Sequence, residues 1–577
     1  MSTSLQRSVL SLLEDTGVSL STEGEDRLYR SHGQTNTEIY QLKYTSIMKR
    51  MPDVVMWPES TEDVEKVVQV AHDHNLVIIP FGGGTNVTGA VACPENELRT
   101  IISLDTSQMG LRGHLEMENT QHPNEDQAFS EHAQSTVEQG TYAHKEESSL
   151  DETKSSRLQR IKVQSAIPKK RSNLLKWNGW GYRDTLFEDS DSIVVLRGGR
   201  YLPACKLPGF TEWAVKTFDF DRHYKRAVRE MPQAFPSPKM SSSNIEDLLV
   251  QVTMVTARGT LERACLGPRV SCGPDFNHIV LGSEGTLGVI TKVVLKIRPQ
   301  PRCQKFGSIL FPNFEAGVKC LREIAKKRCQ PSSIRLVDNV QLKAGQFFRP
   351  DPGYLELLTD GLKKLYVTKI LGFRDDEMCA ATVLFEGDPE DVKNNEDKIY
   401  SIAKRYGGIP AGESNGRRGY MLTYIIAYIR DFACDYYFIG DSFETSVPWD
   451  KTVLLCINVK KRLTQECTAL SIKFFETSCR VTQTYDAGSC IYFYFGFNAR
   501  DFENPDQTLT YLQHCARDEI IACGGSLSHH HGVGKIRSHW YPEHVSQVGL
   551  ELYRSTKQAL DPNNVFASGN LLLPSDL

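Results

Sequence analysis

Three consecutive glycines directly after an apolar, β-branched run constrain this chain more than any other feature of its sequence. The run IIPFGGGTNVTGA spans residues 78–90. Glycine loses more backbone entropy on ordering than any other residue and adds no side chain to a core. Such a run suits a tight turn, or a loop whose backbone N–H groups approach an anion. It has neither the GxGxxG spacing of a Rossmann loop nor the lysine of a P-loop, so by itself it leaves both interpretations open.

The glycine run follows a predicted helix and a predicted strand. Ser60 is a suitable N-cap with acidic residues in the first turn, and apolar residues follow at helical spacing: Val64, Val67, Val68 and Ala71. The segment LVIIP (76–80) is short and β-branched, as is typical of a buried strand, and TIISLDTS (100–107) predicts the next strand. The glycines therefore lie in a loop at the end of a strand.

A second glycine-containing turn, GSEGTLGVIT, spans residues 282–291. Gly285 and Gly288 would again let backbone approach a ligand, and Thr286 could donate a hydrogen bond to it. We expect strands on both sides of this turn, within residues 276–299. The pairing of two such turns favours a ligand over a purely structural role.

Length and charge narrow the class of protein. A chain of 577 residues suggests roughly two to four domains. The net charge of −4 gives no basic field, which argues against a nucleic-acid partner. The 15 cysteines form no CxxC pair and no zinc-like Cys/His spacing, so we expect reduced, mostly buried thiols. No window is apolar enough for a signal peptide or a membrane span, so we expect a soluble or peripheral protein.

The composition changes abruptly at Gly110. From residue 110 to 172 the chain is rich in Glu, Gln, Ser, His and Thr, and we expect this segment to be disordered. Packed structure resumes around LLKWNGWGYRDT (174–185), and QAFPSPKM (233–240) is typical of a linker. The basic run IPKKRSNLLKW (167–177) is predicted to be solvated, although a weak contact with anionic lipid headgroups also fits it.

Several polar residues are candidates for chemistry. CIYFYFGFN (490–498) alternates, so Tyr492 and Tyr494 are expected on the face opposite Ile491, Phe493, Phe495 and Phe497. A plain half-buried tyrosine and a catalytic one both fit this pattern. The histidines of SHHHG (528–532) alone would suggest a metal site, but the sequence offers no convincing third ligand, so no metal is predicted.

The longer motifs resemble one family. The two glycine turns together are similar to the FAD-binding domain of the vanillyl-alcohol-oxidase superfamily. Within it, the chain resembles the alkylglycerone-phosphate synthase (alkyl-dihydroxyacetone-phosphate synthase) family, through RTIISLDTSQM, LKWNGWGYRD, SSIRLVDN, IAYIRD, SFETSVPWD, CRVTQTYDAGSCIYFYF and GGSLSHHHGVGK. The resemblance covers nearly all of the chain after Asn244.

The resemblance implies an α+β protein in which a two-subdomain FAD-binding domain is joined to an α+β cap domain. It implies an enzyme that exchanges the acyl group of acyl-dihydroxyacetone phosphate for a long-chain fatty alcohol. The exchange would use non-covalent FAD, through a covalent flavin adduct and without net redox change. The expected segments are 1–109 and 241–300 for the FAD-binding domain, 110–172 disordered, 173–240 displaced, 301–525 for the cap, and 526–577 for a C-terminal active-site segment.

The resemblance also implies roles for single residues. Tyr492 would donate and accept a proton, Arg430 would bind the substrate phosphate, and Arg335 would be required for activity. The family's active-site histidine group corresponds to His529, His530 and His531, which could also supply the positive charge that lowers the pKa of Tyr492. Contacts to FAD are expected from Pro80, Phe81, Gly82, Gly83, Gly84, Thr85, Asn86, Glu284, Gly285, Thr286, Leu287, Gly288, Val289 and Ile290.

One region departs from the family pattern. In the family the KWNGWGY segment precedes the flavin domain, whereas here it lies inside that domain, within an inserted stretch of residues 110–239. The family's second run of flavin contacts, with its STVGG and TRASG motifs, is not found in this chain. This indicates either a misassembled coding sequence, which we favour, or a chain that binds flavin poorly.

Two other functions remain open at this point. The same fold would suit an FAD-linked 2-hydroxy-acid dehydrogenase, and loss of the flavin contacts would leave a non-catalytic chain. The resemblance implies a peroxisomal homodimer with possible peripheral membrane contact, but the sequence PSDL at 574–577 is not an SKL-type address.

Overall fold

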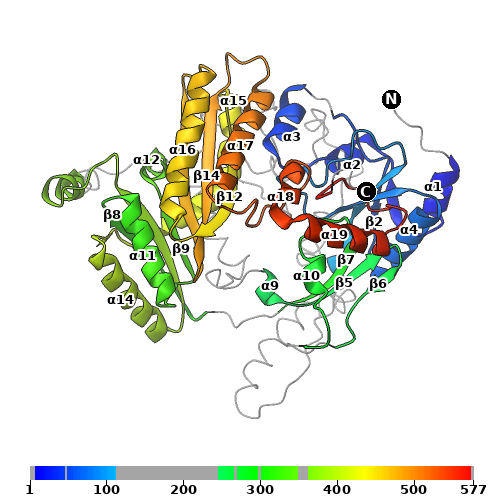
Figure 1. Ribbon diagram of the computed structural model, residues 1–577, viewed down its shortest axis with the longest axis horizontal. Coiled ribbons are helices and arrows are strands. Elements are labelled where there is room, and N and C mark those ends of the chain that lie inside the picture. The colour runs from blue at the N-terminus through cyan, green and yellow to red at the C-terminus, as the bar shows by residue number, and fades with distance from the viewer. Residues whose placement is uncertain are drawn as a thin grey trace, which may run out of the picture.

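The computed structural model describes residues 7–45, 48–111, 245–265, 270–295, 301–347 and 361–572. These residues form two parts that lie side by side: two small sheets with their helices, and one large sheet with its helices (Figure 1). The expectations for residues 112–240, including disorder, a displaced segment and a linker, lie outside the described residues.

The first small sheet carries the first glycine turn. Its strands are β1 (Ser19–Ser21), β2 (Val54–Trp57), β3 (Val77–Phe81) and β4 (Ile101–Asp105), in the order β1-β2-β4-β3. β4 runs parallel to both β2 and β3, and β1 pairs antiparallel with β2. The accompanying helices are α1 (Arg7–Glu14), α2 (Gly24–Tyr29), α3 (Asn36–Tyr40) and α4 (Thr61–Asp73), with short helical turns at Gln41–Thr45 and Thr106–Leu111.

The helix before the glycine turn forms as its sequence predicts. Ser60 is the N-cap of α4, and its side chain accepts a hydrogen bond from the backbone N–H of Asp63 at 3.1 Å. The predicted apolar stripe is the buried face of the helix: Val64, Val67, Val68 and Ala71. The strand predicted at 76–80 is β3 and the strand predicted at 100–107 is β4, so the glycines follow a strand end as expected.

The second small sheet carries the second glycine turn. It is antiparallel, in the order β6-β5-β7, and consists of β5 (Leu249–Thr256), β6 (Gly259–Leu261) and β7 (Val289–Leu295). The expectation of strands on both sides of the turn is wrong on one side. The segment before it forms the one-turn helix α10 (Asn277–Val280), where the carboxylate of Asp275 accepts the N–H of Asn277 at 3.0 Å. A further one-turn helix, α9 (Ile245–Leu248), precedes β5.

The large sheet has seven strands, all antiparallel to their neighbours. Its order is β11-β8-β10-β9-β13-β14-β12. The strands are β8 (Cys303–Phe311), β9 (Ser333–Val337), β10 (Cys379–Gly387), β11 (Ile409–Pro410), β12 (Phe438–Pro448), β13 (Phe475–Thr484) and β14 (Gly488–Asn498). The helices are α11 (Phe314–Lys326), α12 (Asn339–Phe347), α14 (Pro389–Arg405), α15 (Glu413–Asp435), α16 (Thr452–Ala469) and α17 (Pro505–Ala522), with a short helical turn at Tyr366–Ile370.

The two faces of the large sheet differ. One face packs against α11, α14 and α16 around an apolar core, and Gly317 of α11 lies directly against Leu336 of β9. The other face carries α15, whose Gly419 lies against Thr382 of β10. Ile491, Phe493, Phe495 and Phe497 all belong to the apolar core, which confirms the predicted alternation of β14.

Residues beyond α17 return the chain to the small sheets. They form a helical turn at Ser538–Trp540, α18 (Tyr541–Val545) and α19 (Gln547–Leu560), which lie beside β5 and α10 in Figure 1. The two parts also meet elsewhere, because Lys43 forms an ion pair with Asp435 at 2.5 Å and the Tyr44 hydroxyl donates to the carbonyl of Cys434 at 2.6 Å. None of the helices within the described ranges is both long enough and apolar enough to cross a bilayer.

Candidate active site

A row of side chains crosses four strands on the α15 face of the large sheet. Directly opposed residues link Val337 of β9 to Arg480 of β13, Arg480 to Tyr492 of β14, and Tyr492 to Glu444 of β12. Directly opposed residues in antiparallel strands point to the same side of a sheet. The register therefore places a guanidinium, a phenol and a carboxylate next to one another.

Tyr492 and Glu444 are connected through a histidine from a distant segment. The Tyr492 hydroxyl lies 2.8 Å from Nε2 of His531, and Nδ1 of His531 lies 3.5 Å from a carboxylate oxygen of Glu444. Glu444 is fully buried and the ring of His531 is nearly so. The arrangement is a carboxylate–imidazole–phenol series, in which the carboxylate lies at ion-pair distance from the imidazole, while Nδ1 of His531 has no hydrogen-bond partner among the described residues.

Glu444 also shapes the histidine loop. Its carboxylate accepts hydrogen bonds from the Ser528 hydroxyl at 2.8 Å and from the backbone N–H groups of His529 and His531, the latter at 3.1 Å. These bonds bend residues 528–531 into a loop, rather than the extended segment in which His529 and His531 would share a face. The sequence motifs assign no role to Glu444, which lies within SFETSVPWD. Strand β12 carries two carboxylates, Asp441 and Glu444, and nothing in the sequence distinguishes the one that meets the histidine loop.

Two buried arginines balance this carboxylate. Arg537 donates to Glu444 at 3.2 Å and to the carbonyl of Gly532 at 2.9 Å. Arg517 donates to the carbonyls of Glu444 and Leu527, both at 2.8 Å, and burial lowers its pKa to about 9. Burial alone would raise the pKa of Glu444, but the charges of Arg537 and Arg517 oppose it, and that pKa lies well below its usual range.

The expectation that the histidines supply positive charge to Tyr492 is wrong. Burial lowers the pKa of His531 to about 3, so its ring is neutral at pH 7. The pKa of Tyr492 is also not lowered. Burial first, and then Tyr494, raise it well above its usual value, against the opposing effect of Arg480. The positive charge next to the phenol comes from Arg480, whose Cζ lies 5.2 Å from the centre of the Tyr492 ring.

The other two histidines form a second series. The Tyr485 hydroxyl lies 2.5 Å from Nε2 of His529, and Nδ1 of His529 lies 2.8 Å from Nδ1 of His530. Cys490 is close enough that one ligand atom from each of Cys490, His529 and His530 lies within 4.8 Å of the others. The structure thus offers the third soft ligand that the sequence did not reveal, while the absence of a metal remains a prediction.

The two predicted arginines lie at different places. Arg335 of β9 is 9% exposed, and its Cζ lies 5.0 Å from the centre of the Tyr420 ring on α15. Arg430 of α15 donates to the backbone carbonyl of Gln34 at 3.0 Å and to its side-chain oxygen at 3.3 Å. The backbone N–H of Gln34 donates to the carbonyl of Asn86 at 2.6 Å. Arg430 is therefore linked to the first glycine turn, and the roles of both arginines remain predictions.

The first glycine turn presents bare backbone. Gly82 and Gly83 are exposed, and a Cβ on Gly82 would meet no atom within 4 Å. Gly84 has a φ of +67°, and a Cβ there would lie 2.8 Å from the Phe81 ring. Asn86 stabilises the end of the turn, because its side-chain oxygen accepts the N–H groups of Thr88 at 3.2 Å and Ala90 at 2.7 Å. Pro80, Phe81 and Thr85 complete the predicted segment.

The second glycine turn is largely buried. A Cβ on Gly285 would lie 3.3 Å from Pro80 of the first turn, and a Cβ on Gly288 would collide with the carbonyl of Val255 on β5. The hydroxyl of Thr286 donates to the carbonyl of Ser283 at 2.7 Å and contacts the Tyr553 hydroxyl, so both contacts lie within the protein. Close backbone packing thus accounts for these glycines. Of the remaining predicted residues, Leu287 and Val289 are buried and Ile290 is exposed.

The histidine loop and the two glycine turns meet at Glu284. Its carboxylate accepts the backbone N–H groups of Val533 and Gly534, both at 2.6 Å. Lys535 donates to the carbonyl of Gly89 at 3.1 Å and to the side chain of Asn570 at 3.1 Å, and burial lowers its pKa to about 8. We call Glu284, Lys535 and Asn570 the C-terminal clamp, because they hold residues 532–570 against both turns.

The described residues of the first turn fit FAD. Exposed glycine backbone at the end of a strand, where no Cβ restricts the approach of a ligand to Gly82, is suited to a pyrophosphate. The clamp brings this turn and the Tyr492 site together through one short segment. These features concern the phosphate end of the coenzyme.

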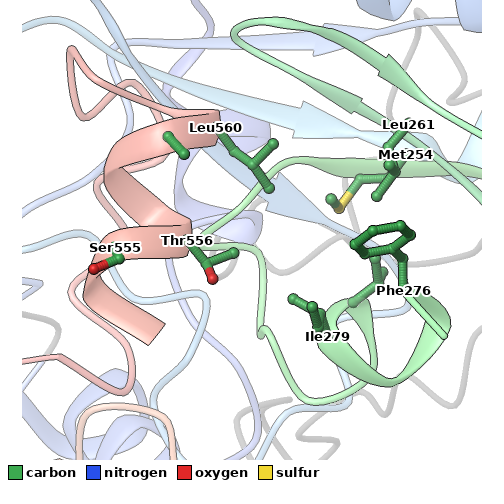
Figure 2. A pocket seen from close by; sticks show the side chains of 9 residues that line it. Met254, Leu261, Phe276, Ile279, Ser555, Thr556 and Leu560 are labelled. Atoms are coloured by element: carbon green, nitrogen blue, oxygen red, sulfur yellow. The ribbon is translucent and has the colours of Figure 1, made fainter. Parts of the chain in front are cut away.

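An apolar pocket of about 340 Å³ lies elsewhere, between α19 and the β5–β6 hairpin. Figure 2 shows Thr556 and Leu560 facing Met254, Phe276 and Ile279 across it. None of the predicted site residues lines this pocket.

Comparison with known families agrees with this architecture. An FAD binding domain model matches residues 52–128, and the model of the C-terminal domain of FAD linked oxidases matches residues 300–571. The fold and the site thus define an FAD-linked oxidase-type protein, in which an FAD-binding domain is combined with an α+β C-terminal domain.

Individual relatives are more specific. The chain is 38% identical over 566 residues to an alkyldihydroxyacetonephosphate synthase from Caenorhabditis elegans, covering 98% of this chain and 83% of the relative. A synthase of the same name from Dictyostelium discoideum is 27% identical, covering 93% and 76%. A solved structure of an alkyldihydroxyacetonephosphate synthase superimposes with a TM-score of 0.62 at 21% identity, over 97% of this chain and 84% of that one. The chain belongs to the alkyldihydroxyacetonephosphate synthase family.

Proposed function

We propose that this chain is an FAD-dependent alkyldihydroxyacetonephosphate synthase. It would replace the acyl group of acyl-dihydroxyacetone phosphate with a long-chain fatty alcohol, and so form an ether bond. Family membership supports the reaction, and the Glu444–His531–Tyr492 series is the observation that supports the site. When bound, FAD supplies the covalent chemistry at the substrate carbon.

Tyr492 acts as a proton relay and not as a base that is already deprotonated in the resting enzyme. Because burial raises the pKa of the phenol, Tyr492 keeps its proton at pH 7. It can accept the proton of the substrate carbon only as its own proton passes to a partner. His531 is that partner, since its Nε2 lies 2.8 Å away and its ring is neutral.

Glu444 completes the relay. A neutral buried histidine is a weak proton acceptor unless the resulting imidazolium is stabilised. The ionised carboxylate of Glu444, 3.5 Å from Nδ1 of His531, raises the pKa of that ring against the larger lowering effect of burial, and so offsets part of the cost of forming the imidazolium. Reversal of the same transfers returns the proton to the product carbon. Arg430 would bind the substrate phosphate, and Arg335 would support the site from β9.

The reaction is tested with flavin-loaded protein, acyl-dihydroxyacetone phosphate and labelled hexadecanol. The expected product is labelled ether lipid, with deuterium at the reacting carbon when the assay is run in heavy water. Bleaching of the flavin by D-lactate without ether formation would instead favour a 2-hydroxy-acid dehydrogenase. A purified chain that is colourless and takes up no FAD would favour a non-catalytic protein.

The glycine turn allows a separate test of FAD binding. A Cβ on Gly82 meets open space, so Gly82→Val should leave the apoprotein folded and yet weaken FAD binding at least tenfold. Fluorescence titration with FAD measures the binding, and thermal unfolding of the apoprotein is the control. Unchanged affinity would contradict a role for this loop.

The cellular setting is also proposed from the resemblance. The family resemblance suggests a homodimer in the peroxisome. Peripheral membrane contact is proposed because both organic substrates are amphiphiles. Sedimentation equilibrium of the purified protein tests the dimer, and flotation with anionic vesicles tests the membrane contact.

A further inference from the structure

Arg480 lies at the centre of the site without an assigned role. It stands opposite Tyr492 in the β13–β14 pair. Its Cζ lies 5.2 Å from the centre of the Tyr492 ring and 4.9 Å from that of Tyr494. The two rings are themselves stacked, with their centres 5.2 Å apart. The guanidinium is thus held against a platform of two phenols beside the reacting hydroxyl.

Among the residues that the structure describes, the guanidinium of Arg480 finds no hydrogen-bond acceptor. Its Nε is buried without a hydrogen-bond partner, and no ion pair of Arg480 occurs within the described ranges of the chain. The neighbouring Arg517 and Arg537 differ, because both donate to carbonyls and Arg537 also to the carboxylate of Glu444. Burying a guanidinium N–H without an acceptor is unfavourable, because the hydrogen bond that it made to water is not replaced. A cation kept in this state is suited to an anion that arrives with the substrate.

Two anionic groups enter or form in the proposed reaction: the substrate phosphate and the released fatty-acid carboxylate. Arg430, the predicted phosphate ligand, lies on α15 and is bonded to Gln34 beside the first glycine turn. Arg480 instead lies across one strand pair from Tyr492, where the bond to the acyl group breaks. The position beside the reacting carbon favours the carboxylate.

We propose that Arg480 forms a carboxylate subsite that binds the fatty acid as it leaves. This inference rests on the proposed function. In the exchange, the bond between the substrate carbon and the ester oxygen breaks, and its electron pair leaves on the carboxylate. The fatty alcohol's oxygen forms the new bond to that carbon and loses its proton to solvent, so the products are the ether, the carboxylate and one proton. A guanidinium pairs with both carboxylate oxygens, and so stabilises the charge that develops on the leaving group.

The subsite is tested by inhibition of the flavin-loaded enzyme with two probes. Decanoate is a fatty carboxylate short enough to remain monomeric, and dihydroxyacetone phosphate carries the phosphate alone. For Arg480→Gln the inhibition constant of decanoate should rise at least tenfold, while that of dihydroxyacetone phosphate changes less than threefold. Arg430→Gln should show the opposite pattern. Arg480→Lys keeps the positive charge but loses the two parallel N–H donors of the guanidinium. Its inhibition constant for decanoate should lie between those of the wild type and Arg480→Gln.

The outcomes separate the two proposals. An active wild type whose decanoate inhibition is unchanged in Arg480→Gln would overturn the subsite and leave the proposed function standing. Loss of dihydroxyacetone phosphate inhibition in Arg480→Gln would show that Arg480 binds phosphate, which also overturns the subsite. A wild type that binds FAD but forms no ether would fail the proposed function itself. If Arg480→Gln does not fold, Arg480→Lys decides the matter by the same two inhibition constants.

Discussion

The two faces of the seven-stranded sheet are built from the same strands, but one face forms the apolar core and the other carries the candidate active site. On β14, Ile491 and Phe493 belong to the apolar core under α11 and α16, while Tyr492 between them faces Glu444 and Arg480. The apolar face gains its stability from burial of hydrocarbon. The α15 face holds partly buried charges and phenols that are suited to proton transfer. Neighbouring residues of one strand therefore contribute to different properties, one to stability and the next to chemistry. The following substitutions test whether activity and stability can be changed independently.

The largest expected effect is that of Tyr492→Phe. Removal of the hydroxyl deletes the group that meets His531 at 2.8 Å, while the ring is retained. We expect kcat for ether formation to fall about 10²–10⁴-fold, the usual contribution of a positioned acid or base. The melting temperature should stay nearly unchanged. Tyr494→Phe is the matched control, and a Tyr492→Phe enzyme with more than a tenth of wild-type activity would contradict the relay.

Phe493→Ala tests the other face. Phe493 is fully buried and stacks on Phe443, with the ring centres 5.4 Å apart. Truncation should lower the free energy of unfolding by about 3–5 kcal/mol, through lost transfer energy and the cavity left behind. Urea unfolding measures the loss. Activity per folded molecule should be preserved at low temperature, and a stable but inactive variant would mean that the two faces are not separable.

Glu444→Gln keeps the shape of the side chain and removes its charge. Loss of a charged hydrogen-bond partner amounts to about 1.5–3 kcal/mol, which is roughly a 10- to 100-fold reduction in kcat. Glu386→Gln is a suitable control, because Glu386 is a buried carboxylate of β10 in the same sheet that accepts from Gln304 at 2.7 Å. The pH dependence of kcat should shift for Glu444→Gln alone, which a purely structural role would not produce.

A smaller effect is expected from acid. The folded pKa of His531 is about 3, below the value of about 6.5 in an unfolded chain. The unfolded state therefore binds more protons between these values, and stability falls as the pH falls through that window. Between pH 7 and 5 the wild type should lose on the order of 2 kcal/mol relative to His531→Gln. Asp441, whose pKa burial raises to about 6, acts in the opposite direction in both proteins and cancels from this difference. Parallel pH profiles of unfolding would contradict a neutral, buried His531.

Local features were predictable because their causes are local. The Ser60 cap and the apolar stripe of α4 depend on residues within a few positions of one another, and the alternation of β14 on the period of a strand. The helix α10 was not predicted because a short apolar run fits a strand as well as a helix.

The electrostatic details of the site were not predictable from local pattern. Glu444 and His531 are 87 positions apart. The β12–β14 register brings Glu444 to Tyr492, and the hydrogen bond from the backbone N–H of His531 to Glu444 holds the histidine near the same phenol. The state of the histidines depends on burial, which three adjacent histidines in a sequence do not reveal. Arg480 was visible within CRVTQTYDAG, but its lack of an acceptor appears only when the neighbouring strands are in place.

The C-terminal clamp also sets an order in time. Lys535 and Asn570 hold the histidine loop against glycine turns that are made several hundred residues earlier in synthesis. A nascent chain that has exposed both turns still lacks the segment carrying His531. The proton relay is thus completed, and joined to the first glycine turn, only after residues 531–570 have been synthesised, so a nascent chain that ends before them exposes an unfinished interface.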